Sequence, residues 1–336
     1  MKYHSTLRLS FVLIFMMTVV VQAQNKPAVI FDTDMGPDYD DVGAIAILHA
    51  LADSGQVNIL ATIASTKYKG VASVLNIFNT YFGRPLIPVG VPRGKAVDKR
   101  DVQHWSDSII ARYPHLLQTN DEAAESVELY RMILASRPDN SVTIITVGFL
   151  TNLAGLLESP GDKYSPFPGS ELVRRKVSLL VSMAGKFPAG NEFNIREDAI
   201  AAKKVYEHWP TKVLFSGFEI GETIKTGLPL ISNKSITESP VKDVFRISIP
   251  LAKNDSAGRM SWDQTAVIVG VKGHRPWYKL KPGSIVVNED GTNSWNDSTG
   301  RHAYLLPDVP AARVTTYINK LMQHQPVKNT QSPVSR

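Results

Sequence analysis

Short apolar runs rich in β-branched residues alternate with helical segments along most of this chain, and this alternation restricts its fold more than any other feature. Six runs are typical of buried strands: residues 28–31, 57–64, 87–91, 141–147, 176–183 and 212–216. Apolar strands that alternate with helices belong to parallel sheets joined by right-handed crossovers. The sequence therefore predicts a single α/β domain whose mainly parallel, open sheet is flanked by helices, in a Rossmann-like arrangement.

The segments between these runs have either helical periodicity or the composition of loops. The predicted helices span residues 42–51, 71–81, 123–136, 152–157, 198–207, 264–271 and 309–322. Polar or Gly/Pro-rich composition predicts an irregular flap at 92–120 and loops at 158–171 and 185–194. Residues 226–325 are expected to mix helices with loops. We expect one domain over residues 24–325 and a disordered tail over 326–336, because no repeat or linker-like break interrupts the pattern.

The N-terminus has the pattern of an export signal. Lys2 and Arg8 precede an apolar stretch at 11–21, and the small residue Ala23 follows. This stretch of 11 residues is too short for a membrane span, which needs about 20 apolar residues. We therefore expect residues 1–23 to be a cleaved signal peptide, and the mature protein to be periplasmic or secreted without contacting a membrane. We expect no lipoprotein anchor, because no Cys follows the cleavage site.

Composition argues against several classes of function. The 336 residues contain no Cys, so disulfides, thiolate catalysis and zinc–thiolate sites cannot form. The formal net charge is +6, or +4 without Lys2 and Arg8, and there is no long basic run. So mild an excess of positive charge gives no indication of nucleic-acid binding.

Five aspartates fall within ten residues directly after the first predicted strand: Asp32, Asp34, Asp38, Asp40 and Asp41. In open α/β sheets, ligands bind just outside the carboxyl ends of the strands. Carboxylates gathered there repel one another unless a cation neutralises them, and hard divalent cations prefer oxygen ligands. The simpler interpretation is a solvated turn in which Asp40 or Asp41 caps the next helix. Five acids beside a buried strand favour a metal or substrate site instead. The spacing excludes an EF-hand, because Pro37 and Gly43 stand where that loop needs Gly and Glu.

Three further segments carry polar groups that could converge on the aspartates. They are residues 146–152, which turn at Gly148, residues 190–194 (Gly-Asn-Glu-Phe-Asn) and residues 261–263 (Ser-Trp-Asp). The amides and the acid of the second segment are suited to binding vicinal hydroxyls. Taken alone, Asn191 and Asn194 are typical turn residues, and Asp263 is a typical helix cap.

Together these segments resemble a known family. The ordered motifs Asp-x-Asp-x-Gly…Asp-Asp, Gly-x-Leu-Thr-Asn, Glu-Phe-Asn and Trp-Asp resemble those of the inosine/uridine-preferring nucleoside hydrolases, which are Ca²⁺-dependent N-ribohydrolases. The resemblance covers about residues 28 to 266. It implies the nucleoside hydrolase fold, a homodimer or homotetramer, and hydrolysis of a small-molecule ribonucleoside to ribose and free base.

Carried over by position, the resemblance assigns a Ca²⁺ site and a catalytic base. The implied ligands are the carboxylates of Asp34, Asp41 and Asp263 and the backbone carbonyl of Val147. Asp34 is also the implied general base, which takes a proton from the attacking water. Asp32 is implied to lie behind the ligands.

The resemblance also assigns the substrate contacts: Asp40, Asn191, Glu192 and Asn194 for the ribose, and Trp262 for the base. The acidic loop has two residues more than the family pattern, which leaves open whether Asp38 takes the role of Asp40. Trp262 replaces a His found in many relatives, as in the purine-preferring branch. We expect its indole to stack on a purine, worth ~1–3 kcal/mol, the alternative being a packing role near the helix start. His104 and His302 are the candidates for the leaving-group acid, and we expect both at the surface.

Two interpretations compete with the hydrolase. A haloacid-dehalogenase-like phosphatase also carries Asp-x-Asp after a strand, but it requires Thr or Val where Gly36 stands. A periplasmic nucleoside- or sugar-binding protein on the same fold is the alternative from another class. The longer acidic loop and Ser-Thr-Lys at 65–67, where the family has Gly-Asn, leave this alternative open. A hydrolase of another N-riboside is a variant of the leading interpretation.

Overall fold

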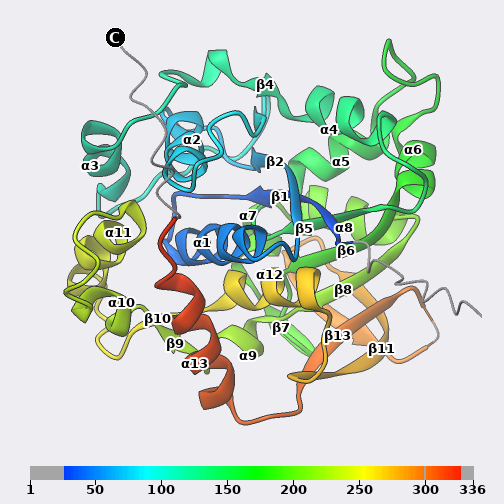
Figure 1. Cartoon of the computed structure of the whole chain (residues 1–336). Coiled ribbons are helices and arrows are strands. Elements are labelled where there is room, and N and C mark those ends of the chain that lie inside the picture. Colours follow the sequence, from blue (N-terminus) through cyan, green and yellow to red (C-terminus); the bar gives the residue numbers. More distant parts are fainter. Residues whose placement is uncertain (1–25, 299, 327–336) are drawn as a thin grey trace, which may run out of the picture.

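An eleven-stranded sheet runs through the computed structural model, which describes residues 26–298 and 300–326 (Figure 1). The strand order is β4-β3-β2-β1-β5-β6-β8-β13-β11-β12-β7. The strands from β4 to β13 are parallel: β1 (Ala28–Thr33), β2 (Asn58–Ala64), β3 (Val89–Val91), β4 (Ala124–Glu125), β5 (Val142–Thr146), β6 (Val177–Met183), β8 (Lys212–Ser216) and β13 (His302–Pro307). Antiparallel pairing adds β11 (Tyr278–Val287), β12 (Thr292–Asn296) and β7 (Ala189–Asn191). The predicted α/β class with a mainly parallel sheet is confirmed.

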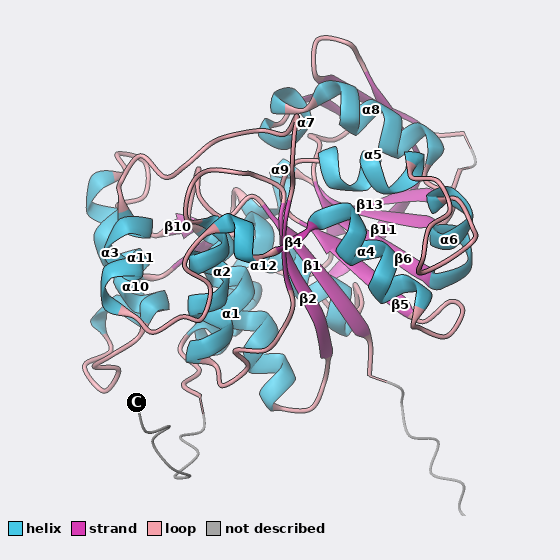
Figure 2. Cartoon of the chain, turned by 90° about the horizontal axis from the view of Figure 1, so that it is seen from above, coloured by secondary structure: helices cyan, strands magenta, loops and turns pink. Residues whose placement is uncertain are grey.

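Helices cover both faces of this sheet (Figure 2). The face that carries the N-terminal helix holds α1 (Asp40–Asp53), α2 (Val71–Tyr81), α11 (Pro240–Ser248), α12 (Trp262–Lys272) and α13 (Ala311–Met322). The opposite face holds α4 (Ser126–Ala135), α5 (Thr151–Glu158), α6 (Gly169–Lys176) and α8 (Ala199–His208). Shorter elements are α3 (Trp105–Arg112), α7 (Phe193–Glu197), α9 (Phe218–Gly221), α10 (Leu228–Ser232) and the pair β9 (Lys225–Thr226) and β10 (Arg259–Met260).

The alternation of side chains along β1 explains why the sheet is covered on both sides. Val29 and Phe31 pack into the apolar cluster that contains α1 and α12, and Ile30 packs into the one that contains α4 and α5. Successive side chains of a strand point to opposite faces, so an uninterrupted apolar run needs two covering layers.

Helices α1 and α12 pack closely against each other, and their N-termini both reach the site described below. Gly43 on α1 makes the close approach possible, because a Cβ there would lie 2.3 Å from Nε2 of Gln264 on α12. Both helices are almost entirely buried, from Asp40 to Leu51 and from Asp263 to Gly270. This contact fixes two acidic helix starts side by side.

Several local predictions were wrong. Part of the expected flap at 92–120 is the helix α3, and the expected loop at 158–171 gives way to α6 from Gly169. The expected loop at 185–194 contains β7 and the start of α7. The region 226–325 contributes three long sheet strands rather than helices and loops alone.

The predicted signal peptide at 1–23 lies outside the described residues, as does the predicted tail beyond Pro326. Among residues 26–298 and 300–326, no helix has both the length and the apolar character needed to cross a membrane.

Candidate active site

A cavity of about 250 Å³ opens at the carboxyl ends of β1, β5 and β6, where the sequence predicted a site. The residues that line it come from these strand ends, from α1, α7 and α9, and from the β10–α12 segment. They are Asp34, Asp38, Asp40, Val147, Met183, Glu192, Phe193, Asn194, Phe218, Arg259, Trp262 and Asp263. Seven of the nine residues predicted for the site therefore line the same cavity. The two that do not line it are Asp41 and Asn191.

Asp34 follows the end of β1 and has its carboxylate buried at the base of the cavity. Burial raises the pKa of Asp34 well above its ordinary value of 3.8, and the nearby carboxylates of Asp41, Asp38 and Asp40 raise it further. The backbone makes room for Asp34 at Gly148, where a Cβ would lie 2.4 Å from the Asp34 amide nitrogen. The tight turn predicted at this glycine is therefore what lets the end of β5 approach the acidic loop.

Asp41 lies in the first turn of α1, directly behind the cavity wall. One of its oxygens accepts a hydrogen bond from the Thr33 hydroxyl, and the other is buried without a hydrogen-bond partner among the described residues. Burial raises the pKa of Asp41 to about 6, with a contribution from the neighbouring Asp40 carboxylate. Burial of a carboxylate oxygen without a hydrogen-bond donor costs free energy of folding, unless a bound cation neutralises its charge.

Asp40 begins α1 and holds the N-terminus of α12. Its Oδ2 accepts from the amides of Trp262 and Asp263 at 3.1 and 3.4 Å, and its Oδ1 accepts from Nε and Nη2 of Arg259 at 3.0 and 2.7 Å. Asp38 forms an ion pair with the same guanidinium at 2.9 Å. Burial raises the pKa of Asp40 to about 7 and that of Asp38 to about 6, although Arg259 opposes both shifts.

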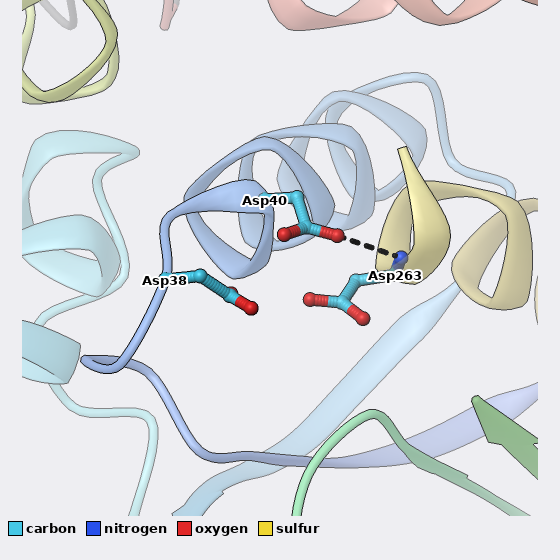
Figure 3. Close-up of side chains that lie close together, drawn as sticks. All are labelled: Asp38, Asp40 and Asp263. Carbon is cyan, nitrogen blue, oxygen red and sulfur yellow. Dashed lines mark hydrogen bonds between the residues drawn. The ribbon is translucent and has the colours of Figure 1, made fainter. Parts of the chain in front are cut away.

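The carboxylates of Asp38, Asp40 and Asp263 turn toward one another across the gap between α1 and α12 (Figure 3). Each offers an oxygen within 4.8 Å of the other two. Burial raises the pKa of Asp263, and the four aspartates of the acidic loop add to that shift. The structure therefore brings the Trp-Asp motif to the acidic loop, as the motif order predicted.

Asp32 lies below the cavity and is fully buried. Its Oδ2 accepts from the Tyr130 hydroxyl and from Asn152 Nδ2, both at 2.9 Å, and Thr146 contacts its Oδ1 at 3.5 Å. Burial raises the pKa of Asp32 to about 7, against the effect of these hydrogen bonds. All three partners are neutral, so Asp32 joins β1, α4 and α5 beneath the cavity.

The segment predicted to bind hydroxyls is held rigidly by its own hydrogen bonds. Glu192 caps α7, because its Oε1 accepts from the Asn194 amide at 2.8 Å and its Oε2 from the amides of Ile195 and Gly185 at 3.1 and 3.2 Å. Asn194 Nδ2 donates to the backbone carbonyl of Val147 at 3.1 Å. The Val147 carbonyl, predicted as a metal ligand, thus lies at the cavity with Asn194 as its partner.

Asn191 lies apart from the cavity. It ends the edge strand β7, its side chain is exposed, and its Oδ1 accepts from Arg196 Nη1 at 2.7 Å. The structure does not bring this predicted ribose contact to the other site residues.

One side of the cavity is aromatic. Trp262 and Phe218 lie with ring centroids 5.2 Å apart, and the Trp262 indole donates to the Phe218 carbonyl at 2.7 Å. Gly221 permits this packing, because a Cβ there would lie 2.4 Å from the Trp262 ring. Trp262 is half-buried and contributes to both packing and the cavity surface.

Neither histidine considered as a leaving-group acid lines the cavity. His104 is exposed and pairs with Asp107 at 3.2 Å. His302 is buried on β13, which contradicts its predicted surface position, and burial lowers its pKa to about 4. The sequence did not predict three other residues of the cavity, Arg259, Phe218 and Met183, because none of them lies in a recognisable motif.

The donor set fits a hard cation. Five aspartates supply only oxygen, burial and mutual repulsion raise their pKa values, and one buried oxygen of Asp41 has no hydrogen-bond donor among the described residues. The ligand set that the resemblance implies, Asp34, Asp41 and Asp263 with the Val147 carbonyl, stays a prediction, because the carboxylates whose oxygens lie within 4.8 Å of one another are those of Asp38, Asp40 and Asp263.

Comparison with known proteins agrees with this geometry. The sequence model of the family described as inosine-uridine preferring nucleoside hydrolase matches residues 29–295, and the chain therefore belongs to this metal-dependent hydrolase family. The phosphatase interpretation is thereby excluded.

The pyrimidine-specific ribonucleoside hydrolase RihA of Shewanella sp. (strain MR-7) is 28% identical over 233 residues. That match covers 66% of this chain and 65% of the relative, which is less than two thirds of its length.

Two solved structures share the fold. The inosine-uridine preferring nucleoside hydrolase of Bacillus anthracis matches with a TM-score of 0.67 and 17% identity, and the purine-preferring ribonucleoside hydrolase of Gardnerella vaginalis with 0.66 and 18%. Each match covers 88% of this chain and 99% of the other.

Proposed function

We propose that the protein is an exported, Ca²⁺-dependent hydrolase that cleaves the N-glycosidic bond of purine ribonucleosides to give ribose and free base. The observation that carries the proposal is the cavity itself, which is lined both by carboxylates, among them Asp34 and Asp263, and by the aromatic pair Trp262 and Phe218. An acidic part suits a sugar that becomes positively charged, and an aromatic part suits a flat base.

Asp34 is the group best suited to take a proton from the attacking water. It lies in the cavity wall, and its raised pKa would fall once a cation offsets the neighbouring carboxylates. Bound Ca²⁺ would supply positive charge that makes a water easier to deprotonate and would leave coordination positions for ribose hydroxyls. The carboxylates around the sugar would stabilise the oxocarbenium character that develops as the bond breaks.

The hydrogen bonds favour Asp38 over Asp40 for direct contact with the ribose. The two oxygens of Asp40 already accept four hydrogen bonds, from Arg259 and from the amides at the start of α12. Asp38 pairs with Arg259, its one ion-pair partner among the described residues, and has a side chain that is 36% exposed. It therefore retains acceptor capacity for a hydroxyl. Asp40 would position Trp262 and Asp263 instead.

Glu192 and Asn194 are proposed to complete the ribose contacts. The side-chain Nδ2 of Asn194 already donates to the carbonyls of Val147 and Met183, so its Oδ1 would accept from the sugar. Glu192 already accepts hydrogen bonds from three backbone amides, so its main effect would be to hold the segment 190–194 in place.

Purine preference is proposed from the Trp262–Phe218 pair, because a purine base has the larger flat surface to stack on an indole ring. The pyrimidine-specific relative and the purine-preferring structural neighbour show that both preferences occur on this fold. Export is proposed from the N-terminal pattern of Lys2, Arg8 and Ala23.

Release of reducing sugar from inosine, adenosine, guanosine, uridine and cytidine, with Ca²⁺ and with a chelator, tests the proposal. We expect release from the purine nucleosides that stops on chelation. Absence of release from all five, with nucleosides still raising the melting temperature, would instead support a binding protein on this fold. Release from pyrimidines alone would refute the purine preference. Detection of the mature chain, starting after Ala23, outside the cytoplasm tests export.

A further inference from the structure

Arg259 is the one positively charged side chain among the described residues that line the acidic cavity. It lies on the short strand β10, three residues before Trp262. Its side chain is 12% exposed, so it is held within the wall rather than extended into solvent. No feature of the proposed reaction uses it.

The guanidinium is fixed from several directions. It makes two hydrogen bonds to Asp40 at 2.7 and 3.0 Å, an ion pair with Asp38 at 2.9 Å, and a longer contact with Asp255 at 3.6 Å. Its central carbon also lies 5.0 and 5.2 Å from the ring centroids of Tyr39 and Trp262. The planar fork of arginine suits such simultaneous contacts, whereas the ammonium of lysine would keep the positive charge but not all of these contacts.

These contacts divide the aspartates in and directly behind the cavity wall into two groups. Asp38 and Asp40 have a cation from the chain itself. Asp34, Asp41 and Asp263 have no ion pair with any Lys, Arg or His in the described part of the chain. The three carboxylates without a charged partner are those that the family resemblance implies as Ca²⁺ ligands.

We propose that Arg259 is a positioning residue that reserves Asp38 and Asp40 for substrate and helix contacts and so restricts the cavity to one bound cation. This role rests on the cation site of the proposed function. Oxygens of Asp38, Asp40 and Asp263 all lie within 4.8 Å of one another, close enough to share an ion. The guanidinium occupies two of these three carboxylates and thereby excludes a second ion.

Calcium titration by calorimetry on the mature chain tests this role. The wild type should bind one Ca²⁺. Arg259→Met, which removes the charge but keeps a long side chain, should bind two. Arg259→Lys keeps one positive charge beside Asp38 and Asp40 and should bind one. Arg246→Met is the matched control, because the Arg246 side chain is exposed and pairs with Asp243 on α11, and it should bind one. One Ca²⁺ bound by Arg259→Met with unchanged affinity, or two by the wild type, would overturn the proposal, as would none by the wild type.

A second pair of variants covers the case in which Arg259→Met does not fold. Asp38→Asn should change Ca²⁺ affinity by less than about tenfold, the lower end of what loss of an outer-shell group costs, whereas Asp263→Asn, which replaces a predicted ligand carboxylate, should weaken it by about 100-fold or more. Equal losses in both would overturn the division of the carboxylates. If no nucleoside is hydrolysed but wild type and Arg259→Met bind one and two ions, the proposed function fails and the role of Arg259 stands.

Discussion

Replacing Asp32 by Asn should stabilise the metal-free protein at pH 8 and leave its stability almost unchanged near pH 4. The amide is isosteric with the carboxylate and can keep its contacts. Its oxygen can accept from Tyr130 and Asn152, as Asp32 does at 2.9 Å, and its nitrogen faces the Thr146 hydroxyl. The substitution therefore removes a buried charge without leaving a hydrogen-bonding group unpaired.

The pH dependence follows from the pKa of Asp32, which burial raises from 3.8 to about 7. Between these values the folded chain binds a proton that the unfolded chain releases, so the free energy of unfolding falls as pH rises through this window. Above about pH 7 the cost of the buried charge is complete, and below about pH 4 it is absent. At about 1.4 kcal/mol per pH unit, the difference between the two pKa values corresponds to at most about 4 kcal/mol.

Urea unfolding in the presence of a chelator, at pH 4.5 and pH 8, measures this difference. The exposed Asp98→Asn is the matched control and should change the free energy by no more than about 0.5 kcal/mol at either pH. A gain from Asp32→Asn that is equal at both pH values would show that ionisation of Asp32 is not its cause. A loss at pH 8 would show that Tyr130 and Asn152 stabilise the carboxylate more than burial penalises it.

Three other substitutions test the site directly. Asp34→Asn should lower turnover by about 10²–10⁴-fold, as expected for loss of a general base, with an unchanged circular dichroism spectrum; unaltered turnover would remove Asp34 from that role. Trp262→Ala should lower kcat/KM for inosine more than for uridine, by up to ~1–3 kcal/mol of lost stacking, and equal losses would assign Trp262 to packing against Phe218. Gly148→Ala should destabilise the fold by about 1–3 kcal/mol in urea unfolding, because the new Cβ would lie 2.4 Å from both the Asp34 amide and Ser65 Oγ; unchanged stability would mean that the turn moves aside freely.

The parallel part of the fold could be predicted because its strands are apolar on both faces. The run at 28–31 is the core of β1, and the acidic residues after it lie where the strand ends. Helix α2 has the predicted bounds, and α1 begins two residues earlier than predicted, at Asp40. That earlier start matters, because it puts Asp40 and Asp41 in the first turn of α1.

The antiparallel strands could not be predicted in the same way. In β11, Lys279 and Lys281 alternate with apolar residues, and Pro282 and Gly283 interrupt the run. Such residues argue against a strand when only the sequence is considered. Helix α3 was missed for a different reason: it begins after His104, which has a left-handed φ of 56° and no capping hydrogen bond.

The site was predictable where its residues lie in motifs and unpredictable where spatial contact alone brings them together. Asp263 and Asn194 were found from short motifs and line the cavity. Arg259 reaches Asp40 across 219 positions of sequence, and a single arginine carries no mark of such a partner. Asn191 belongs to a motif but points to Arg196 instead, because the edge strand β7 ends there.

The contact between Gly43 and Gln264 also limits how this sequence can change over generations. With 2.3 Å between the missing Cβ and the glutamine amide, even alanine at position 43 requires the side chain opposite to retreat or shorten. Neither position lines the cavity, so a substitution at either one does not change the substrate contacts directly. It does change how closely the acidic starts of α1 and α12 can pack. Descendants of this chain should therefore change positions 43 and 264 together, with a side chain appearing at the first only where the second has become smaller.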